Sequence, residues 1–168
     1  ICTQSAESHM FWKCTTSLRE RLMNKIKYVI FDVDGTLTDG SINISDNGEL
    51  YKSFSVKDGY ALGNLMPQNS MIPIIITARK SEIVTRRCKE LGITYLFQNC
   101  HDKAQKIKEL AKRFSSNQND NGVYEEFAYM GDDIPDLQGM KICVCKGCPS
   151  DAVSQIKEIC DYICENSG

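Results

Sequence analysis

The stretch from Tyr28 to Asp39 constrains the fold more than any other part of the chain. It reads Tyr-Val-Ile-Phe-Asp-Val-Asp-Gly-Thr-Leu-Thr-Asp, with four apolar or aromatic residues ahead of two carboxylates, Asp32 and Asp34. The apolar run is too short for a buried helix and predicts a buried strand. Ligands of open parallel sheets bind beyond the carboxyl ends of the strands, where these acids would lie. Two carboxylates within about 7 Å repel each other, so the pair favours a bound cation or a proton on one acid.

Further apolar strands are predicted to carry polar side chains to the same edge of the sheet. Residues 72–76 lead into Thr77-Ala78-Arg79, and residues 127–130 lead into Gly-Asp-Asp-Ile-Pro-Asp at positions 131–136. A short strand at 95–97 precedes Lys103, near the start of a helix that runs to about Phe114. Helical patterns separate these strands, so the sequence predicts an α/β fold with a doubly wound, Rossmann-like parallel sheet.

The remaining elements follow from local patterns. Residues 40–56 alternate on either side of Asp46-Asn47-Gly48 and predict a β-hairpin that forms a flap beside the site. Lys57-Asp58-Gly59 is interpreted as a break before a helix at 60–66 that Pro67 ends or kinks. Helices are further predicted at 17–22, 81–91 and 150–159, and strands at 141–145 and 161–164.

Each candidate site residue also has an ordinary structural interpretation. Asp32 and Asp34 could close a β-turn, and Thr77 could cap a helix. Lys103 could be a solvated surface charge, while acids at the start of a helix favour its dipole, as Asp133 and Asp136 would. Cys-x-Cys-x-x-Cys at 143–148 lacks a fourth ligand at zinc spacing, so these residues are interpreted as reduced, packed thiols.

Asp32-Val33-Asp34-Gly35-Thr36 resembles the first motif of the haloacid dehalogenase superfamily of phosphatases. Three further motifs of that superfamily follow in order. The resemblance implies that Asp32 is the nucleophile and Asp34 the general acid and base. It also implies that Thr77 and the backbone amide of Ala78 hold the phosphoryl oxygens. Lys103 would neutralise charge on the nucleophile and the phosphate.

The same resemblance implies a metal site. Asp32, Asp132 and the backbone carbonyl of Asp34 would bind Mg²⁺, a cation that prefers oxygen ligands. Asp133 and Asp136 would support the site, and one of them would anchor Lys103. Dehalogenases and ion pumps of the superfamily lack an acid at position 34, so its presence indicates phosphate ester hydrolysis through an aspartyl phosphate.

The spacing of the motifs leaves no room for a cap domain. Thr77 follows Asp32 by 45 residues and Lys103 follows Thr77 by 26, and only the hairpin lies in the first gap. Over residues 25–163 the chain resembles the capless phosphatases of 3-deoxy-octulosonate 8-phosphate. That resemblance implies a sugar-acid phosphate as substrate, a homotetramer joined by its hairpins, and a role in lipopolysaccharide biosynthesis. Arg79 is predicted to bind the sugar acid, since a guanidinium suits a carboxylate.

Two alternatives stay open, one an enzyme of the same family and one from another functional class. One is a phosphatase of nine-carbon sialic-acid 9-phosphates, a branch that tends to carry Glu at the position of Arg79. The other is a non-catalytic oligomerisation domain of a nucleotide-sugar synthetase. Retention of the five motif residues speaks against the second alternative, because a silent domain has no need of them.

Composition narrows the class of partner. The 168 residues carry a formal net charge of −2, with 42% hydrophobic and 25% charged residues, which is ordinary for a globular domain. The balance offers no basic surface for nucleic acid or acidic lipid, and no apolar run approaches a membrane span. We therefore expect a cytoplasmic protein with small-molecule partners. Residues 1–24 are interpreted as a tail with a short helix, and 25–168 as one phosphatase domain.

Overall fold

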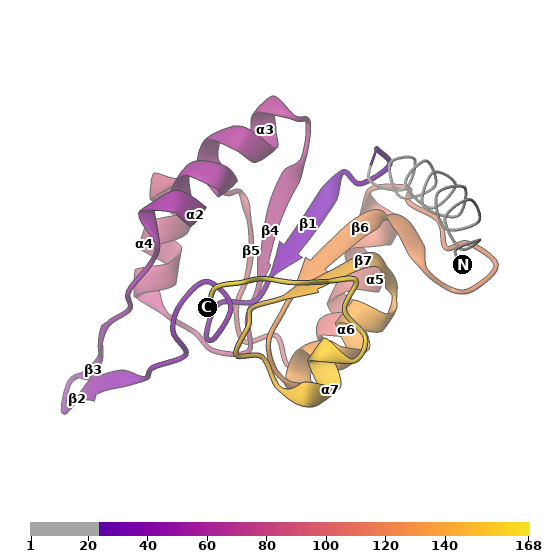
Figure 1. The fold of residues 1–168 in the computed structure, drawn as a ribbon. Coiled ribbons are helices and arrows are strands. Elements are labelled where there is room, and N and C mark those ends of the chain that lie inside the picture. The colour runs from indigo at the N-terminus through magenta and orange to yellow at the C-terminus, as the bar shows by residue number, and fades with distance from the viewer. Residues whose placement is uncertain (1–23) are drawn as a thin grey trace, which may run out of the picture.

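A six-stranded parallel sheet forms the centre of the computed structural model, which describes residues 24–168 (Figure 1). The strand order is β5-β4-β1-β6-β7-β8, and every neighbouring pair is parallel. The strands are β1 (Tyr28–Phe31), β4 (Ile72–Ile76), β5 (Tyr95–Phe97), β6 (Tyr124–Met130), β7 (Cys143–Cys148) and β8 (Tyr162–Ile163). The order reverses beside β1, the first strand, which is the doubly wound arrangement predicted from the sequence.

Helices cover both faces of the sheet (Figure 1). One face carries α2 (Val56–Tyr60), the π-helical turn η1 (Ala61–Leu65), α3 (Met66–Gln68) and α4 (Glu82–Glu90). The other face carries α5 (Lys103–Arg113), α6 (Leu137–Lys141) and α7 (Ser154–Lys157), with the short 3₁₀ helix η2 (Ile134–Asp136) ahead of α6. None of the helices within residues 24–168 is long and apolar enough to cross a bilayer.

Alternation along the central strands produces two apolar cores. Ile74 and Ile76 of β4 are fully buried beneath α5 and α6, whereas Ile75 between them packs on the α4 side. Ile30 of β1 pairs with Ile74 on one side and Tyr129 on the other, so it is completely enclosed. Because both faces of these strands are covered, their sequences are continuously apolar, which made them recognisable.

A two-stranded hairpin takes the place of a cap. β2 (Asn43–Ser45) and β3 (Gly48–Tyr51) pair as antiparallel strands and extend from the loop after β1 (Figure 1). Ile44 is 68% exposed and Tyr51 is 52% exposed, so the hairpin presents apolar side chains at its surface. Phe54, which lies in the range predicted for the hairpin, instead packs against the α4 core beneath the Arg87 guanidinium, which lies 5.8 Å from the ring centre.

The helix after the hairpin begins earlier than predicted. Ser55 caps α2 by accepting from the Asp58 backbone N–H, and the helical segment continues to Gln68, one residue beyond Pro67. Gly59 was interpreted as part of a break, but it lies inside α2, where a Cβ would stand 2.2 Å from the Arg87 guanidinium. Gly59 is therefore a helical residue packed beneath the Arg87 side chain, and a larger residue would force the guanidinium to move.

Two C-terminal elements also differ from their predicted bounds. Strand β7 begins and ends later than 141–145, because residue 141 completes α6 and Gly147 pairs with both β6 and β8. The helix predicted at 150–159 is reduced to α7, since extended Val153 donates its N–H to the Asp132 carbonyl at 3.0 Å. The helix predicted at 17–22 lies outside the described residues.

Candidate active site

Four strand or helix ends place the predicted site residues at one edge of the sheet. Asp32 directly follows β1 and donates its backbone N–H to the Met130 carbonyl at 3.1 Å. Thr77 follows β4, Asp132 follows β6, and Lys103 begins α5. The site therefore lies in the crevice beside β1, where the strand order reverses.

Lys103 is the buried cation of this site. Only 2% of the residue is exposed, and its ammonium lies 2.9 Å from Asp32 Oδ2 and 2.6 Å from Asp136 Oδ1. Burial lowers the pKa of Lys103, but the two carboxylates outweigh burial and hold that pKa above its ordinary value. The ammonium is therefore charged and fully paired, which rules out the solvated surface lysine considered as the alternative.

Asp136 is the acid that anchors Lys103. It is completely buried, and its Oδ1 also accepts from the Tyr129 hydroxyl at 2.8 Å. Its Oδ2 accepts the backbone N–H groups of Asp132 at 3.1 Å and Asp133 at 3.2 Å. Gly131 makes this possible, because a Cβ there would stand 2.6 Å from the Asp136 carboxyl carbon. The choice left open between the two supporting acids therefore favours Asp136.

Asp133, unlike Asp136, is not paired with Lys103. It is exposed, and its carboxylate accepts the Ile134 backbone N–H at 2.7 Å at the start of η2. This is the helix-terminal position that the sequence offered as the ordinary interpretation of an acid in this motif.

Three carboxylates converge on a position suited to a cation. One oxygen from each of Asp32, Asp132 and Asp136 lies within 4.8 Å of the others, the one such group among residues 24–168. Asp136 already has four donors, so Asp32 and Asp132 are the free ligands. Asp32 Oδ1 is buried without a hydrogen-bond partner, as expected of an oxygen that binds a metal ion. Hard divalent cations take carboxylate oxygens, so the residues present fit such an ion.

The charge on these acids is costly without a cation. Burial and the neighbouring Asp136 raise the pKa of Asp32 to about 7, despite the opposing effect of Lys103. Burial also raises the pKa of Asp132 to about 6, although Thr36 donates a hydrogen bond to it at 2.6 Å. Gly35 is in the left-handed region at φ +94°, and a Cβ there would stand 2.1 Å from Asp132 Oδ2. Glycine is thus required for this approach.

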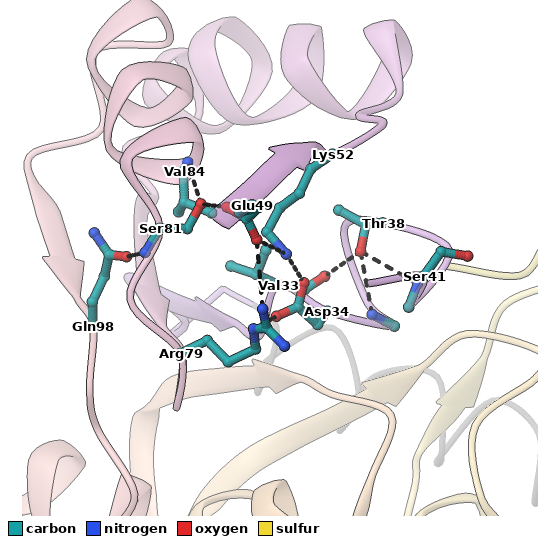
Figure 2. A network of polar contacts seen from close by, with 12 residues as sticks. Val33, Asp34, Thr38, Ser41, Glu49, Lys52, Arg79, Ser81, Val84 and Gln98 are labelled. Atoms are coloured by element: carbon teal, nitrogen blue, oxygen red, sulfur yellow. Dashed lines mark hydrogen bonds and ion pairs between the residues drawn. The ribbon is translucent and has the colours of Figure 1, made fainter. Parts of the chain in front are cut away.

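Asp34 is not a member of the three-carboxylate cluster, and its carboxylate is paired with cations instead. Figure 2 shows its side chain between Lys52, to which it is paired, and Arg79, whose Nε lies 3.6 Å from Asp34 Oδ2. Glu49 of β3 completes the network, at 3.1 Å from the Lys52 ammonium and 3.8 Å from Arg79. This arrangement leaves the Asp34 carboxylate outside the metal cluster, which suits a separate acid and base function.

The comparisons with known proteins agree with this geometry. No protein-family model matches the chain. It is 34% identical over 151 residues to the 3-deoxy-D-manno-octulosonate 8-phosphate phosphatase KdsC of Haemophilus influenzae, which covers 90% of this chain and 79% of that protein. The same identity holds over 143 residues with KdsC of Salmonella typhi, at 85% and 72% coverage.

Solved structures give the same result. A phosphatase of the same name from Moraxella catarrhalis, solved with magnesium, phosphate and KDO, has a TM-score of 0.80 and 34% identity, covering 88% of this chain and 81% of that one. The cobalt-bound phosphatase from Haemophilus influenzae has a TM-score of 0.79 and 32% identity, at 88% and 82% coverage. This chain belongs to the haloacid dehalogenase superfamily. Within it, the chain is a capless phosphatase of the KdsC type.

The acidic cluster can be compared with the metal sites of similar structures. Similar structures hold magnesium in one case and cobalt in another, and the three acids of this chain form a group that could hold such a divalent cation. The sequence-predicted metal set of Asp32, Asp34 and Asp132 differs from the geometric cluster in one member. Asp136 contributes the third side chain of the cluster, whereas the Asp34 side chain is paired with Lys52. The resemblance had assigned only the backbone carbonyl of Asp34 to the metal.

Thr77 differs in one respect from what the sequence indicated. It is buried and directly follows β4, and it donates its N–H to the Phe97 carbonyl at 2.9 Å. The helix cap is Ser81, four residues later, which accepts from the Val84 N–H. Thr77 therefore lies in a strand-to-helix loop, not at a helix N-terminus. Ala78 is half-buried and Arg79 is exposed in this loop.

Lys52 and Glu49 were missed by sequence reasoning, which treated their hairpin only as a flap and an assembly surface. The available signal was weak: two opposite charges three residues apart, Glu49 within β3 and Lys52 directly after it, beside the exposed Leu50 and Tyr51. Nothing in that spacing indicates contact with an acid 18 residues earlier in the chain.

Proposed function

We propose that this protein is a Mg²⁺-dependent phosphatase of a sugar-acid phosphate, namely 3-deoxy-D-manno-octulosonate 8-phosphate. The observation that carries the proposal is the environment of Asp32. One oxygen of this buried carboxylate is paired with Lys103 at 2.9 Å, and the other has no partner. A carboxylate held in this way beside a metal site can serve as nucleophile toward phosphorus.

The reaction proceeds in two steps, through an aspartyl phosphate on Asp32. An oxygen of Asp32 attacks phosphorus in line, the bond from phosphorus to the sugar oxygen breaks, and Asp34 gives its proton to that oxygen. Water then attacks phosphorus of the aspartyl phosphate, Asp34 takes up the proton, and phosphate and free Asp32 are released. Thr77 and the Ala78 amide bind the phosphoryl oxygens, and Lys103 offsets the charge that develops on them.

The metal ion would be held by Asp32, Asp132 and the Asp34 carbonyl. When bound, it supplies positive charge to the transferring phosphoryl group. Two other residues of the chain hold the site in its geometry. Asp136 holds Lys103 in place through its buried ion pair at 2.6 Å, and the Gly35 turn lets Asp132 approach the nucleophile loop.

Arg79 supports an octulosonate substrate. Its side chain is 43% exposed, and its ion pairs with Asp34 and Glu49 are long, at 3.6 and 3.8 Å. Because these ion pairs are long, the guanidinium can turn to a substrate carboxylate at a small cost in free energy. Replacing Arg79 with Glu should lower kcat/KM more for the octulosonate 8-phosphate than for p-nitrophenyl phosphate. Equal losses on both substrates would refute the assigned role.

The proposed enzyme is cytoplasmic and assembles as a homotetramer. The exposed hairpin supports the proposed assembly. Ile42, Ile44, Leu50 and Tyr51 are each more than two fifths exposed, and clustered apolar side chains of this kind mark interaction surfaces. A second copy of the chain, with the same hairpin, would offer a matching surface.

A phosphate-release screen tests the function directly. The panel contains octulosonate 8-phosphate, a nine-carbon sialic-acid 9-phosphate and common sugar phosphates, each with Mg²⁺ and with EDTA. The proposal expects the highest kcat/KM for octulosonate 8-phosphate, and no turnover in EDTA. Preference for the nine-carbon ester would refute the assigned substrate, and activity that survives thorough chelation would refute the metal requirement.

A further inference from the structure

Four charged side chains form a closed ring around Asp34, two residues after Asp32 (Figure 2). Two acids, Asp34 and Glu49, alternate with two cations, Lys52 and Arg79. Each cation contacts both acids. The mechanism proposed above uses only Asp34 and Arg79 of these four residues, which leaves the two hairpin residues without a function.

The two cations of the ring are held very differently. The Lys52 side chain is 2% exposed, is paired closely with Asp34 and lies 3.1 Å from Glu49. The Arg79 side chain is 43% exposed and stays 3.6 Å or more from both acids. Lys52 is therefore enclosed between the two acids, whereas Arg79 can leave the ring.

Glu49 ties Lys52 to the rest of the active site. Its carboxylate accepts the hydroxyl of Ser81, the residue that caps α4. Ser81 is itself held by Gln98, whose side-chain oxygen accepts the Ser81 N–H at 2.5 Å. Ser81, Lys52 and Arg79 hold the pKa of Glu49 below its ordinary value despite its burial, so this acid is charged. The hairpin strand is thus attached to the loop that carries Thr77.

We propose that Lys52 is a positioning residue that orients the Asp34 carboxylate toward the leaving group, and that the hairpin is thereby part of the catalytic apparatus. The inference rests on the proposed function, in which Asp34 is the acid and base. When Arg79 turns to a substrate carboxylate, Asp34 and Glu49 lose one of their two cations. Lys52 remains between them and keeps the Asp34 carboxylate in place.

The chemistry of the leaving group distinguishes this role from a structural one. An alkyl oxygen needs a proton as it leaves, whereas p-nitrophenolate leaves without one. The ratio kcat/KM reports the steps up to the first irreversible one, here transfer of the phosphoryl group to Asp32, so the later use of Asp34 as a base does not affect it. Loss of Lys52 should therefore reduce kcat/KM for alkyl esters more than for the aryl ester.

The experiment compares wild type, Lys52→Met and a matched control, Lys57→Met, which removes an exposed lysine of α2 outside the ring. Substrates are octulosonate 8-phosphate, glycerol 3-phosphate and p-nitrophenyl phosphate, all with saturating Mg²⁺. We expect Lys52→Met to lose about tenfold or more on both alkyl esters and clearly less on the aryl ester, since general acid catalysis contributes about 10²–10⁴-fold. Lys57→Met should match wild type.

Double substitution adds a second readout. In an Asp34→Asn background, with p-nitrophenyl phosphate as substrate, Lys52→Met should cost less than about twofold, because the residue it positions is already gone. Unfolding curves for Lys52→Met establish that the variant is folded at the assay temperature.

The outcomes separate the two proposals. A folded Lys52→Met variant that loses the same factor on alkyl and aryl esters, or loses nothing, would overturn the role of Lys52 while leaving the phosphatase function intact. A wild type that hydrolyses none of the three esters would overturn the proposed function, and the inference about Lys52 with it.

Discussion

Replacement of Asp136 with Asn should destabilise the fold more than its conservative appearance suggests. The side chain is completely buried and accepts from four donors, at 2.6 Å from Lys103, 2.8 Å from Tyr129, and 3.1 and 3.2 Å from two backbone amides. An amide has one acceptor oxygen, so one pair of donors would face an NH₂ group. The Lys103 ammonium would also lose one of its two carboxylates.

The size of the effect follows from these contacts. Breaking a buried ion pair by removing one partner typically costs about 3–5 kcal/mol, because the remaining charge is left uncompensated. Lys103 keeps Asp32 at 2.9 Å, which places the expected loss near the lower end, at about 3 kcal/mol. A matched control lies three residues away: Asp133→Asn keeps the cap on Ile134, since Asn and Asp cap helices about equally well.

Urea unfolding followed by far-UV circular dichroism measures this difference. Both variants and the wild type are compared in EDTA at one protein concentration, so that metal binding and assembly do not shift the transition. Asp133→Asn should lie within about 0.5 kcal/mol of wild type, as surface substitutions usually do. Equal free energies of unfolding for the two variants would show that Asp136 does not anchor Lys103 as described.

Two further outcomes are expected. Because burial raises the pKa of Asp32 to about 7 and that of Asp132 to about 6, the metal-free folded state holds protons that the unfolded chain releases from about pH 4 upward. The free energy of unfolding in EDTA should therefore fall as pH rises from about 5 to 7 and then level off; a rise over that range would contradict the assignment. Light scattering should give about four times 19.0 kDa for wild type and a smaller mass for Ile44→Asp, whereas a wild-type monomer would refute hairpin assembly.

The buried strands could be predicted because both faces of the sheet are covered by helices, so that every side chain of a central strand must be apolar. Residues 28–31 and 72–76 are apolar without interruption, and the polar residue that ends each strand lies at the ligand edge of a parallel sheet. The positions of Asp32, Thr77 and Asp132 at one edge followed from this rule, and the structure confirms them.

Contacts between distant segments could not be predicted in the same way. The local pattern at Gly59 indicates a break, and its position inside α2 beneath the Arg87 side chain is visible only in the folded structure. Asp133 and Asp136 lie in the same short motif, and the local sequence does not distinguish them. Asp136 differs because it is buried against Tyr129 and Lys103, which lie elsewhere in the sequence. The ring at Asp34 depends on how the hairpin folds back, and periodicity carries no information on that.

The central claim is that Asp32 is the nucleophile of a phosphatase. Phosphate release from octulosonate 8-phosphate with Mg²⁺ should therefore be compared between wild type and Asp32→Asn, with circular dichroism to establish that the variant is folded. An amide cannot form the acyl phosphate, so the account predicts turnover by wild type and none above background by the folded variant. Phosphate release by Asp32→Asn at a measurable fraction of the wild-type rate would contradict it.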